Sequence, residues 1–196
     1  MTTIAPAETP GTLIKAAGHR LVGQKGSAFT TQDVIREAGV ALQTFYRYFA
    51  GKDQLILALI ADLISAHCEA LSAATDGVAD PVERLEIFVR STLAPLQSQA
   101  QIAGAQFVTA EHWRLHQLFP TEVRAATQPF TDLIRRQLEV GQAAGLLSPR
   151  NAERDAWLIN NMVMSAYHHY SFQPDDPAMA TVAADVWSFC LAAVKA

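Results

Sequence analysis

The sequence predicts an all-α protein of nine helices. Three observations predict this class. Strand-like alternation of apolar and polar residues is absent, helix-forming Ala, Leu, Gln, Glu and Arg dominate, and Pro and Gly separate segments of helical length. Half of the 196 residues are hydrophobic and 17% are charged, which is enough apolar material for a packed core. The expected helices cover about 9–23, 30–39, 42–48, 52–74, 81–95, 102–117, 121–144, 152–171 and 178–194.

Each early helix has an apolar stripe and a stop signal. Leu13, Ala17 and Leu21 form the stripe of the first helix, which Gly23 or Gly26 ends. In the second helix, Thr30 or Thr31 can serve as the N-cap, and Asp33 in the first turn is favoured by the helix dipole. That helix stops at Gly39, and a short third helix follows. The stripe of the long fourth helix is Leu55, Leu59, Leu63 and Ala66.

Prolines and glycines punctuate the later helices. Pro81 suits the first turn of the fifth helix, and Pro95 kinks or ends it. Pro120 precedes the seventh helix, which Gly145 ends, and Pro149 precedes the eighth. The segment QPDDP, at 173–177, separates the eighth helix from the ninth. No internal repeat interrupts this series, so we expect one small N-terminal unit followed by a larger helical bundle.

Charge is unevenly distributed along the chain. Residues 1–55 contain six basic and four acidic residues, a net charge of +2, whereas the remainder contains nine basic and fifteen acidic residues, a net charge of −6. A basic end on an acidic body allows one face to approach phosphate while the rest repels it. Because the protein as a whole is acidic, we do not expect it to bind polyanions non-specifically.

Several classes are disfavoured by composition. Cys68 and Cys190 lie far apart in apolar helical patterns and are expected to be buried thiols. The N-terminal sequence lacks the basic and apolar regions of an export signal, and the longest uncharged run, 156–174, is too polar for a membrane span. We therefore expect no membrane association and a cytoplasmic location.

The stretch FTTQDVIREAGVALQTFYRYFAGKDQLI, at 29–56, fits a helix-turn-helix. Gly39 can adopt the left-handed backbone that the tight turn needs. Val34 and Ile35 are expected to pack inward from the second helix, and Phe45 and Phe49, four residues apart, from the third. The residues left for another face are Gln43, Thr44, Tyr46 and Arg47, with Tyr48 at its edge. Gln reads adenine through paired hydrogen bonds, and Thr and Tyr hydroxyls reach phosphates.

This stretch resembles the TetR family of bacterial transcription regulators. The residues that carry the resemblance are Thr30, Thr31, Ala38-Gly39-Val40, Thr44, Phe45, Tyr46, Arg47, Tyr48, Phe49, Lys52 and Asp53. The resemblance implies a nine-helix fold with a DNA-binding domain at 1–55 and a ligand-binding and dimerisation domain at 56–196. It also implies that Thr44, Tyr46 and Tyr48 contact bases or backbone, and that Lys52 meets a phosphate. Thr30 or Thr31 would place the second helix on the backbone, and Gln43 is the best candidate for sequence readout.

Two departures from the family pattern concern DNA contacts. The family often has Ser and a further polar residue before the position of Gln43, where this chain has Ala41 and Leu42. The change removes an expected helix cap, worth about 0.5–2 kcal/mol. It also places apolar Leu42 near the groove, where it could meet a thymine methyl group. The N-terminal arm is acidic to neutral, so a minor-groove contact by the arm is not expected.

The last two helices carry very little charge. No residue from Ala156 to Tyr170 is charged, and the segment AMATVAADVWSFCLAAV contains only Asp185. A helix that is apolar nearly all round must bury both faces, one against its own core and the other against a partner. We expect a homodimer through a four-helix interface, the alternative being burial within one large monomer. The interface residues predicted are Met162, Val186, Phe189 and Cys190.

Large side chains in the middle helices exceed simple packing needs. The predicted effector-binding residues are Phe88, Phe107, Trp113, Phe130, Asn161, Met164 and His168. Trp157, Asn161, Met164 and His168 share one side of the eighth helix, where Asn161 and His168 could orient a small, mostly apolar molecule. The alternative is that both polar groups form hydrogen bonds in the core or across the dimer interface.

Neither metal binding nor catalysis is expected. His112 and His116 lie four residues apart, but no Cys or carboxylate has matching spacing, so a solvated or core role is favoured. No nucleophile elbow, phosphate loop or metal motif is present, and no cofactor is predicted.

The preferred function is a dimeric repressor that binds a palindromic double-stranded DNA operator and is released by a small-molecule effector. Two alternatives stay within regulation: a protein without an inducer, and an activator. A third, from another class, is a helical enzyme or carrier of apolar molecules.

Overall fold

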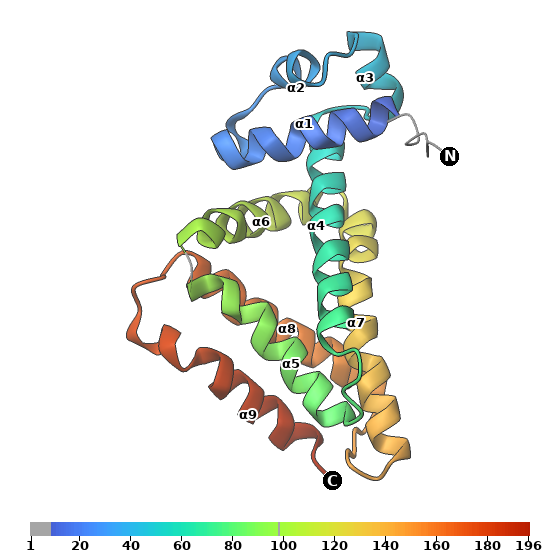
Figure 1. Ribbon diagram of the computed structural model, residues 1–196, viewed down its shortest axis with the longest axis vertical. Coiled ribbons are helices and arrows are strands. Elements are labelled where there is room, and N and C mark those ends of the chain that lie inside the picture. Colours follow the sequence, from blue (N-terminus) through green and yellow to red (C-terminus); the bar gives the residue numbers. More distant parts are fainter. Residues whose placement is uncertain (1–8, 98) are drawn as a thin grey trace, which may run out of the picture.

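The computed structural model describes residues 9–97 and 99–196. Over these residues the chain forms α-helices and short 3-10 helices and no β-strand, which confirms the all-α prediction (Figure 1). The predicted N-terminal arm lies mostly outside the described residues. The helices are α1 (Pro10–Lys25), η1 (Gly26–Ala28), α2 (Thr31–Ala38), α3 (Leu42–Tyr48), α4 (Lys52–Ala74), α5 (Pro81–Leu93), η2 (Ala94–Gln97), α6 (Gln99–Leu118), α7 (Pro120–Ala143), α8 (Ala152–Ser171), η3 (Pro177–Ala180) and α9 (Val182–Val194).

Local chemistry accounts for the helix ends. Thr30 caps α2, as predicted for one of the two threonines, and Gly39 ends the helix in the left-handed conformation at φ 64°. Gly145, at φ 72°, follows α7. Helix α5 ends at Leu93, where the chain tightens into the 3-10 turn Ala94–Gln97, because Pro95 has no backbone N–H to donate to an α-helical hydrogen bond. The ninth helix begins later than expected, at Val182, since Pro177–Ala180 forms a 3-10 turn instead.

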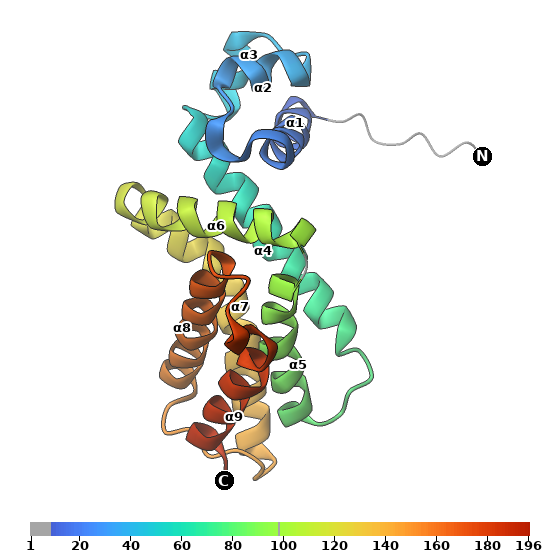
Figure 2. The same cartoon turned by 90° about the vertical axis from the view of Figure 1, so that its left-hand side faces the viewer.

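The helices form an elongated molecule with α1, α2 and α3 at one end (Figure 1). Helix α4 leaves this end and continues along α7, with which it makes extensive contacts. Helices α5, α7, α8 and α9 form the other end, and α6 crosses the middle of the molecule between the two ends (Figure 2). We refer to α1–α3 with the first turns of α4 as the DNA-reading unit, after the role that the family resemblance implies.

The buried side chains form two clusters. The larger joins α5, α7, α8 and α9 with the second half of α4. The smaller joins α1, α2, α3 and the first half of α4, and it also contains Phe107 and Leu115 of α6 and Val123 of α7. The DNA-reading unit therefore does not have a separate core, because α6 and α7 complete it.

Helix α4 is long and apolar enough, by length and composition alone, to cross a membrane. Its apolar side chains already have partners within the chain. Leu55, Ile56, Leu59 and Ile60 are buried in the smaller cluster, and Leu71 is buried in the larger one. A helix that contributes to two cores needs apolar residues along most of its length, and this accounts for its composition.

Candidate nucleic-acid interface and effector core

Helix α3 is fixed by one aromatic face. Phe45 is fully buried, and its ring lies 6.0 Å from that of half-buried Phe49. Val34 of α2 is buried beside them, and Ile35 is half-buried. These four side chains pack inward as predicted, so the opposite face of α3 is held toward solvent by core packing.

The solvent face of α3 carries most of the predicted contact residues. Tyr46 has 52% of its surface exposed, and Leu42, Gln43 and Arg47 are exposed as well. Thr44 is half-buried. Ala41 occupies the N-cap position and provides no side-chain hydrogen bond, which leaves the first amide groups of α3 free of the usual cap.

The ring of Tyr48, the last residue of α3, packs closely against the backbone of Gly11 in α1. A Cβ atom at Gly11 of α1 would lie 2.8 Å from Cδ1 of Tyr48, closer than real side chains approach. Only glycine allows the ring to pack so near the α1 backbone. The guanidinium of Arg47 lies 5.4 Å from the centroid of the same ring. Gly11 thus determines where the end of α3 and its Tyr48 side chain lie.

The N-terminus of α2 is closed by a reciprocal cap. The Thr30 hydroxyl accepts from the Asp33 amide at 3.1 Å, and an Asp33 carboxylate oxygen accepts from the Thr30 amide at 2.9 Å. Hydrogen bonds from Thr30, its amide first, lower the pKa of Asp33 to about 2. Thr31 is half-buried at the first helical position, and Thr30 is exposed. Both lie at the α2 end that would face a phosphate backbone.

The basic residues of the DNA-reading unit fall into two groups. Lys15, Arg20, Lys25 and Arg36 each form an ion pair with an Asp or Glu, at 2.6–3.4 Å. Arg47 and Lys52 meet no carboxylate among the described residues. The Lys52 ammonium instead donates to the carbonyl oxygen of Ser27 at 2.5 Å, and it lies 5.0 Å from the Phe29 ring centroid. The two cations without an anionic partner are those beside the exposed face of α3.

The predicted effector residues do not form one group. Phe88 and Phe130 are buried in the larger cluster. Phe107 is buried in the smaller cluster, because α6 packs that side against the DNA-reading unit, so it lies apart from Phe88. Trp113 is exposed. Asn161 is exposed too, and its side-chain amide donates to the Trp157 carbonyl at 2.7 Å.

His168 is an unusual member of the predicted set. Its Nε2 atom is buried and has no hydrogen-bond partner among the described residues. Burial, with the nearby His112, lowers the pKa of His168 to about 4, so the ring is neutral near pH 7. The His168 ring lies 5.3 Å from that of His112 and 6.0 Å from that of Trp113. Met164, one turn earlier on α8, is half-buried.

Sequence reasoning missed His67 of α4. Its Nε2 lies 2.9 Å from the Thr92 hydroxyl, and its ring lies 6.0 Å from that of Phe130. Burial lowers the pKa of His67, so a neutral polar group sits against the larger core. The available signal was a lone His at helical spacing between Ile64 and Leu71, both apolar.

Two of the four predicted interface residues lie inside the chain's own core. Val186 and Cys190 are buried in the larger cluster, so in this chain they pack inward instead of lying on an exposed surface. Phe189 has 63% of its surface exposed, and Met162 is exposed on α8. Trp157 and Leu158, which the prediction omitted, are large apolar residues exposed on the same helix.

Among the described residues, no group of three metal-ligating side chains comes together.

Known proteins with a similar sequence or fold point to one class. The model of bacterial regulatory proteins of the tetR family matches residues 14–59. The HTH-type transcriptional regulator BetI of Brucella anthropi is 28% identical over 86% of this chain and 84% of its own length. The structure of the transcriptional regulator FadR from Bacillus subtilis, in complex with stearoyl-CoA, has a TM-score of 0.73, 14% identity and coverage of 92% and 97% of the two chains. FadR from Thermus thermophilus, in complex with lauroyl-CoA, has a TM-score of 0.72 at 19% identity, covering 93% and 94%.

A helix-turn-helix at one end of an all-α chain, joined to a larger helical core, defines a DNA-binding transcriptional regulator. The match of residues 14–59 to the tetR family model, together with the BetI relatives, supports a TetR family regulator. The resemblance of residues 29–56 is confirmed, and so is the nine-helix fold predicted from it, over residues 9–97 and 99–196.

Proposed function

We propose that this regulator is a repressor that binds a palindromic operator as a dimer and is released by a small, mostly apolar effector. The observation that carries the DNA-binding part is the solvent face of α3. That face is held outward by buried Phe45, and Arg47 and Lys52 beside it have no carboxylate partner among the described residues. An uncompensated positive charge next to exposed hydrogen-bonding side chains suits a DNA groove. A cytoplasmic location follows from this role.

The contact residues divide by chemistry into two groups. Gln43 is proposed to read a base edge, with Leu42 against a thymine methyl group. Phosphate contacts are assigned to Thr44, Tyr46, Arg47, Tyr48 and Lys52, and to the α2 N-terminus at Thr30 and Thr31. Lys52 can keep its bond to the Ser27 carbonyl while it binds a phosphate, because an ammonium group has three donors.

The test is selection of duplexes by the purified protein from a random-sequence DNA pool. We expect one enriched sequence with two inverted half-sites, because a two-fold dimer presents two α3 helices about 34–36 Å apart. Tyr46→Ala should weaken binding to the selected duplex, since a phosphate contact is lost, while thermal unfolding stays unchanged because Tyr46 is exposed. Fluorescence anisotropy measures the affinity. No enriched duplex, or wild-type affinity from Tyr46→Ala, would contradict the DNA-binding assignment.

Gly11→Ala is expected to weaken binding to the selected duplex, by about tenfold or more. The added Cβ would lie 2.8 Å from Tyr48 Cδ1 and must displace that ring together with the end of α3. A shift of an ångström at a contact surface is enough to lose well-placed hydrogen bonds. The matched control is Gly23→Ala on the same helix, where a Cβ meets nothing within 4 Å. Equal affinities for the two variants would show that DNA binding does not depend on the packing of Tyr48 against Gly11.

The dimer is supported by apolar side chains left on the surface. Trp157, Leu158 and Met162 are exposed on one side of α8, and Phe189 is exposed on α9, which packs beside α8 (Figure 2). Aromatic residues and Met are enriched at the centres of protein interfaces. A second copy of this chain presents the same apolar residues, so a two-fold contact would be self-complementary.

An apolar effector is supported by what lies in the larger core. Phe88 and Phe130 of the larger cluster provide apolar surface, and neutral His67, against Phe130, provides a polar atom. Half-buried Met164 and neutral His168 of α8 lie outside that cluster, where His168 faces His112 and Trp113 of α6. No Arg or Lys occurs between residues 156 and 194 that could pair with a strongly anionic molecule. The FadR structures of similar fold hold acyl-CoA molecules, which carry a long apolar chain. The chemical class of the effector can be tested by adding compounds to the complex of protein and duplex and measuring release of the DNA. The compounds are lauroyl-CoA, neutral lauryl compounds and compact polyanions.

A further inference from the structure

Helix α6 is attached to both ends of the molecule. On one side, Phe107 and Leu115 are buried in the core of the DNA-reading unit. On the other side, Gln106 donates to the Ser171 carbonyl of α8 at 2.9 Å, and the Thr109 hydroxyl lies 3.3 Å from that of Ser171. The position of α6 therefore depends on α8, and the DNA-reading unit is packed on α6.

One side chain of α6 extends this attachment to the start of α4. An Arg114 Nη2 group donates to Asp53 Oδ1 at 2.8 Å and to Glu111 Oε2 at 2.6 Å, and Arg114 Nε also donates to Glu111 Oε2, at 2.8 Å. A single guanidinium thus holds two carboxylates, one on α6 and one in the first turn of α4. The planar guanidinium holds Glu111 through both Nε and Nη2 while Nη2 also reaches Asp53, a geometry that the single nitrogen of lysine does not reproduce.

The buried Glu111 carboxylate keeps the Arg114 side chain attached to α6. Glu111 is only 5% exposed, and an uncompensated charge there would be costly. Arg114 must therefore remain against Glu111 in any stable arrangement of the protein. Its reach toward Asp53 is then set from the α6 side, so Asp53 is drawn to a position that α6 dictates.

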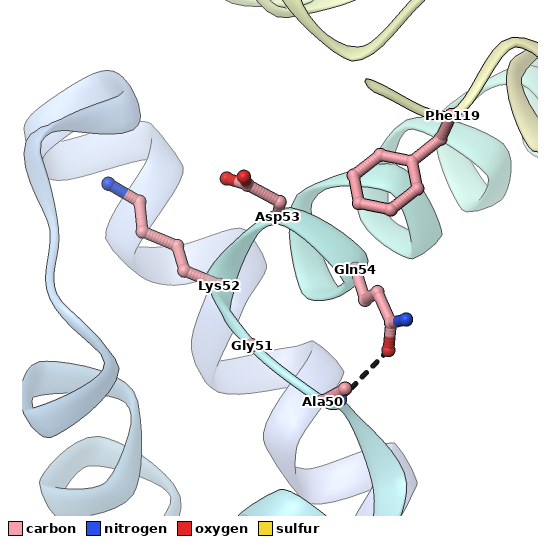
Figure 3. Close-up of a pocket in the computed structure, with 6 residues that line it drawn as sticks. All are labelled: Ala50, Gly51, Lys52, Asp53, Gln54 and Phe119. Carbon is pink, nitrogen blue, oxygen red and sulfur yellow. Dashed lines mark hydrogen bonds between the residues drawn. The ribbon is translucent and has the colours of Figure 1, made fainter.

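Asp53 is next to Lys52, at the point where α3 turns into α4. A pocket of about 300 Å³ opens at this turn, lined by residues 50–54 on one side and by Phe119, after α6, on the other (Figure 3). Within it, Gln54 accepts a hydrogen bond from the Ala50 amide and does not cross to the α6 side. Because this edge of the junction is open, the Arg114–Asp53 contact is the polar link that spans it among the described residues.

We propose that Arg114 is a positioning residue for DNA binding. It bridges Glu111 of α6 and Asp53 of α4, and it thereby sets the orientation of Lys52 and α3 relative to the larger core. The DNA part of this inference rests on the proposed function. Arg114 does not itself need to touch DNA, since it acts through Asp53.

The Asp53→Asn variant distinguishes a positioning role from a simple effect of charge, because the two predict opposite changes in DNA affinity. Removing a carboxylate next to Lys52 would, by electrostatics alone, tighten binding to DNA phosphates. Replacement of the ion pair by a weaker contact to a neutral amide oxygen should instead weaken binding to the selected duplex by about threefold to tenfold, in the range of coupling energies between contacting residues. Arg114→Lys, which keeps a positive charge beside Glu111 but lacks the Nε and Nη2 pair that holds Glu111 while Nη2 reaches Asp53, should weaken binding by a similar factor.

The double variant and a distant pair complete the experiment. If both residues act through one link, Asp53→Asn with Arg114→Lys should bind about as well as either single variant. The control pair is Glu86→Gln with Arg90→Lys on α5, which breaks an exposed ion pair of 2.6 Å far from this junction and should change the affinity less than twofold. Unchanged or tighter binding by Asp53→Asn, or effects that multiply in the double variant, would overturn the proposal.

A readout without DNA distinguishes failure of this inference from failure of the proposed function. The Leu55 amide, bonded to the Gly51 carbonyl at 3.2 Å, and the Phe119 amide, bonded to the Leu115 carbonyl at 2.7 Å, flank the bridge. Hydrogen exchange of both amides should be faster in Asp53→Asn than in the wild type. The midpoint of thermal unfolding should change no more than it does in the control pair. Unchanged exchange would reject the bridge even if the wild-type protein binds DNA. A wild-type protein that selects no duplex would reject the DNA role alone.

Discussion

Leu115→Ala is expected to lower the free energy of unfolding by about 2–5 kcal/mol, the range found when a buried leucine is truncated. Leu115 has 0% of its surface exposed and lies in the cluster that contains Phe45 of α3 and Leu55 of α4. The loss should also weaken binding to the selected duplex, because the packing that holds α3 is loosened. Urea unfolding followed by circular dichroism measures the first effect, and anisotropy measures the second.

The matched control lies one turn further along α6. Leu118 is 54% exposed, so Leu118→Ala removes the same atoms without opening a cavity and should change the unfolding free energy by no more than about 0.5 kcal/mol. Similar destabilisation by the two substitutions would show that α6 does not complete the core of the DNA-reading unit.

The helix-turn-helix could be predicted closely because its determinants are local. The Thr30 cap and the left-handed Gly39 are each set by residues within one turn of helix, and the four-residue spacing of Phe45 and Phe49 already selects one face of α3. Ala41 likewise leaves α3 without a side-chain cap, as its residue type implies. Local chemistry of this kind survives packing unchanged.

The partition of α6 between two cores could not be predicted in the same way. Periodicity identifies the apolar positions of a helix but does not say which other helix covers them. Phe107 therefore looked like a companion of Phe88, whereas the two lie in different clusters. The Arg114–Asp53 contact is harder still, because it joins residues 61 positions apart whose helices meet only in the fold.

For α9, the spacing of the apolar residues indicates which side of the helix packs inside the chain. Val182, Val186, Cys190 and Val194 recur every four residues and are all buried in the chain's own core. Scarcity of charge was taken to indicate the partner-facing side, but it does not distinguish one face of a helix from another. The exposed apolar residue, Phe189, lies off that stripe.

Phe189→Glu is expected to convert a wild-type dimer to a folded monomer. Phe189 is among the most exposed large apolar residues of α9, so a carboxylate there meets water in the monomer and is buried only if a second copy covers it. Light scattering coupled to size exclusion measures the mass, and circular dichroism measures the helix content. Leu63→Glu, at an apolar residue of α4 that is 40% exposed and whose helix packs on α5 and α7, should leave the dimer intact.

Val186→Asp should behave differently, since Val186 packs inside the monomer. An unpaired charge there lacks a hydrogen-bonding partner in both the monomer and the dimer, so the chain should lose cooperative unfolding or aggregate rather than dissociate. The contrast between neighbouring positions separates a surface that a second copy covers from the core beneath it. A wild-type monomer, or a Phe189→Glu variant that remains dimeric, would remove this face of α9 from the interface. A Val186→Asp variant that stays folded and monomeric would place Val186 at the interface after all, because only there would its charge be solvated once the two copies part.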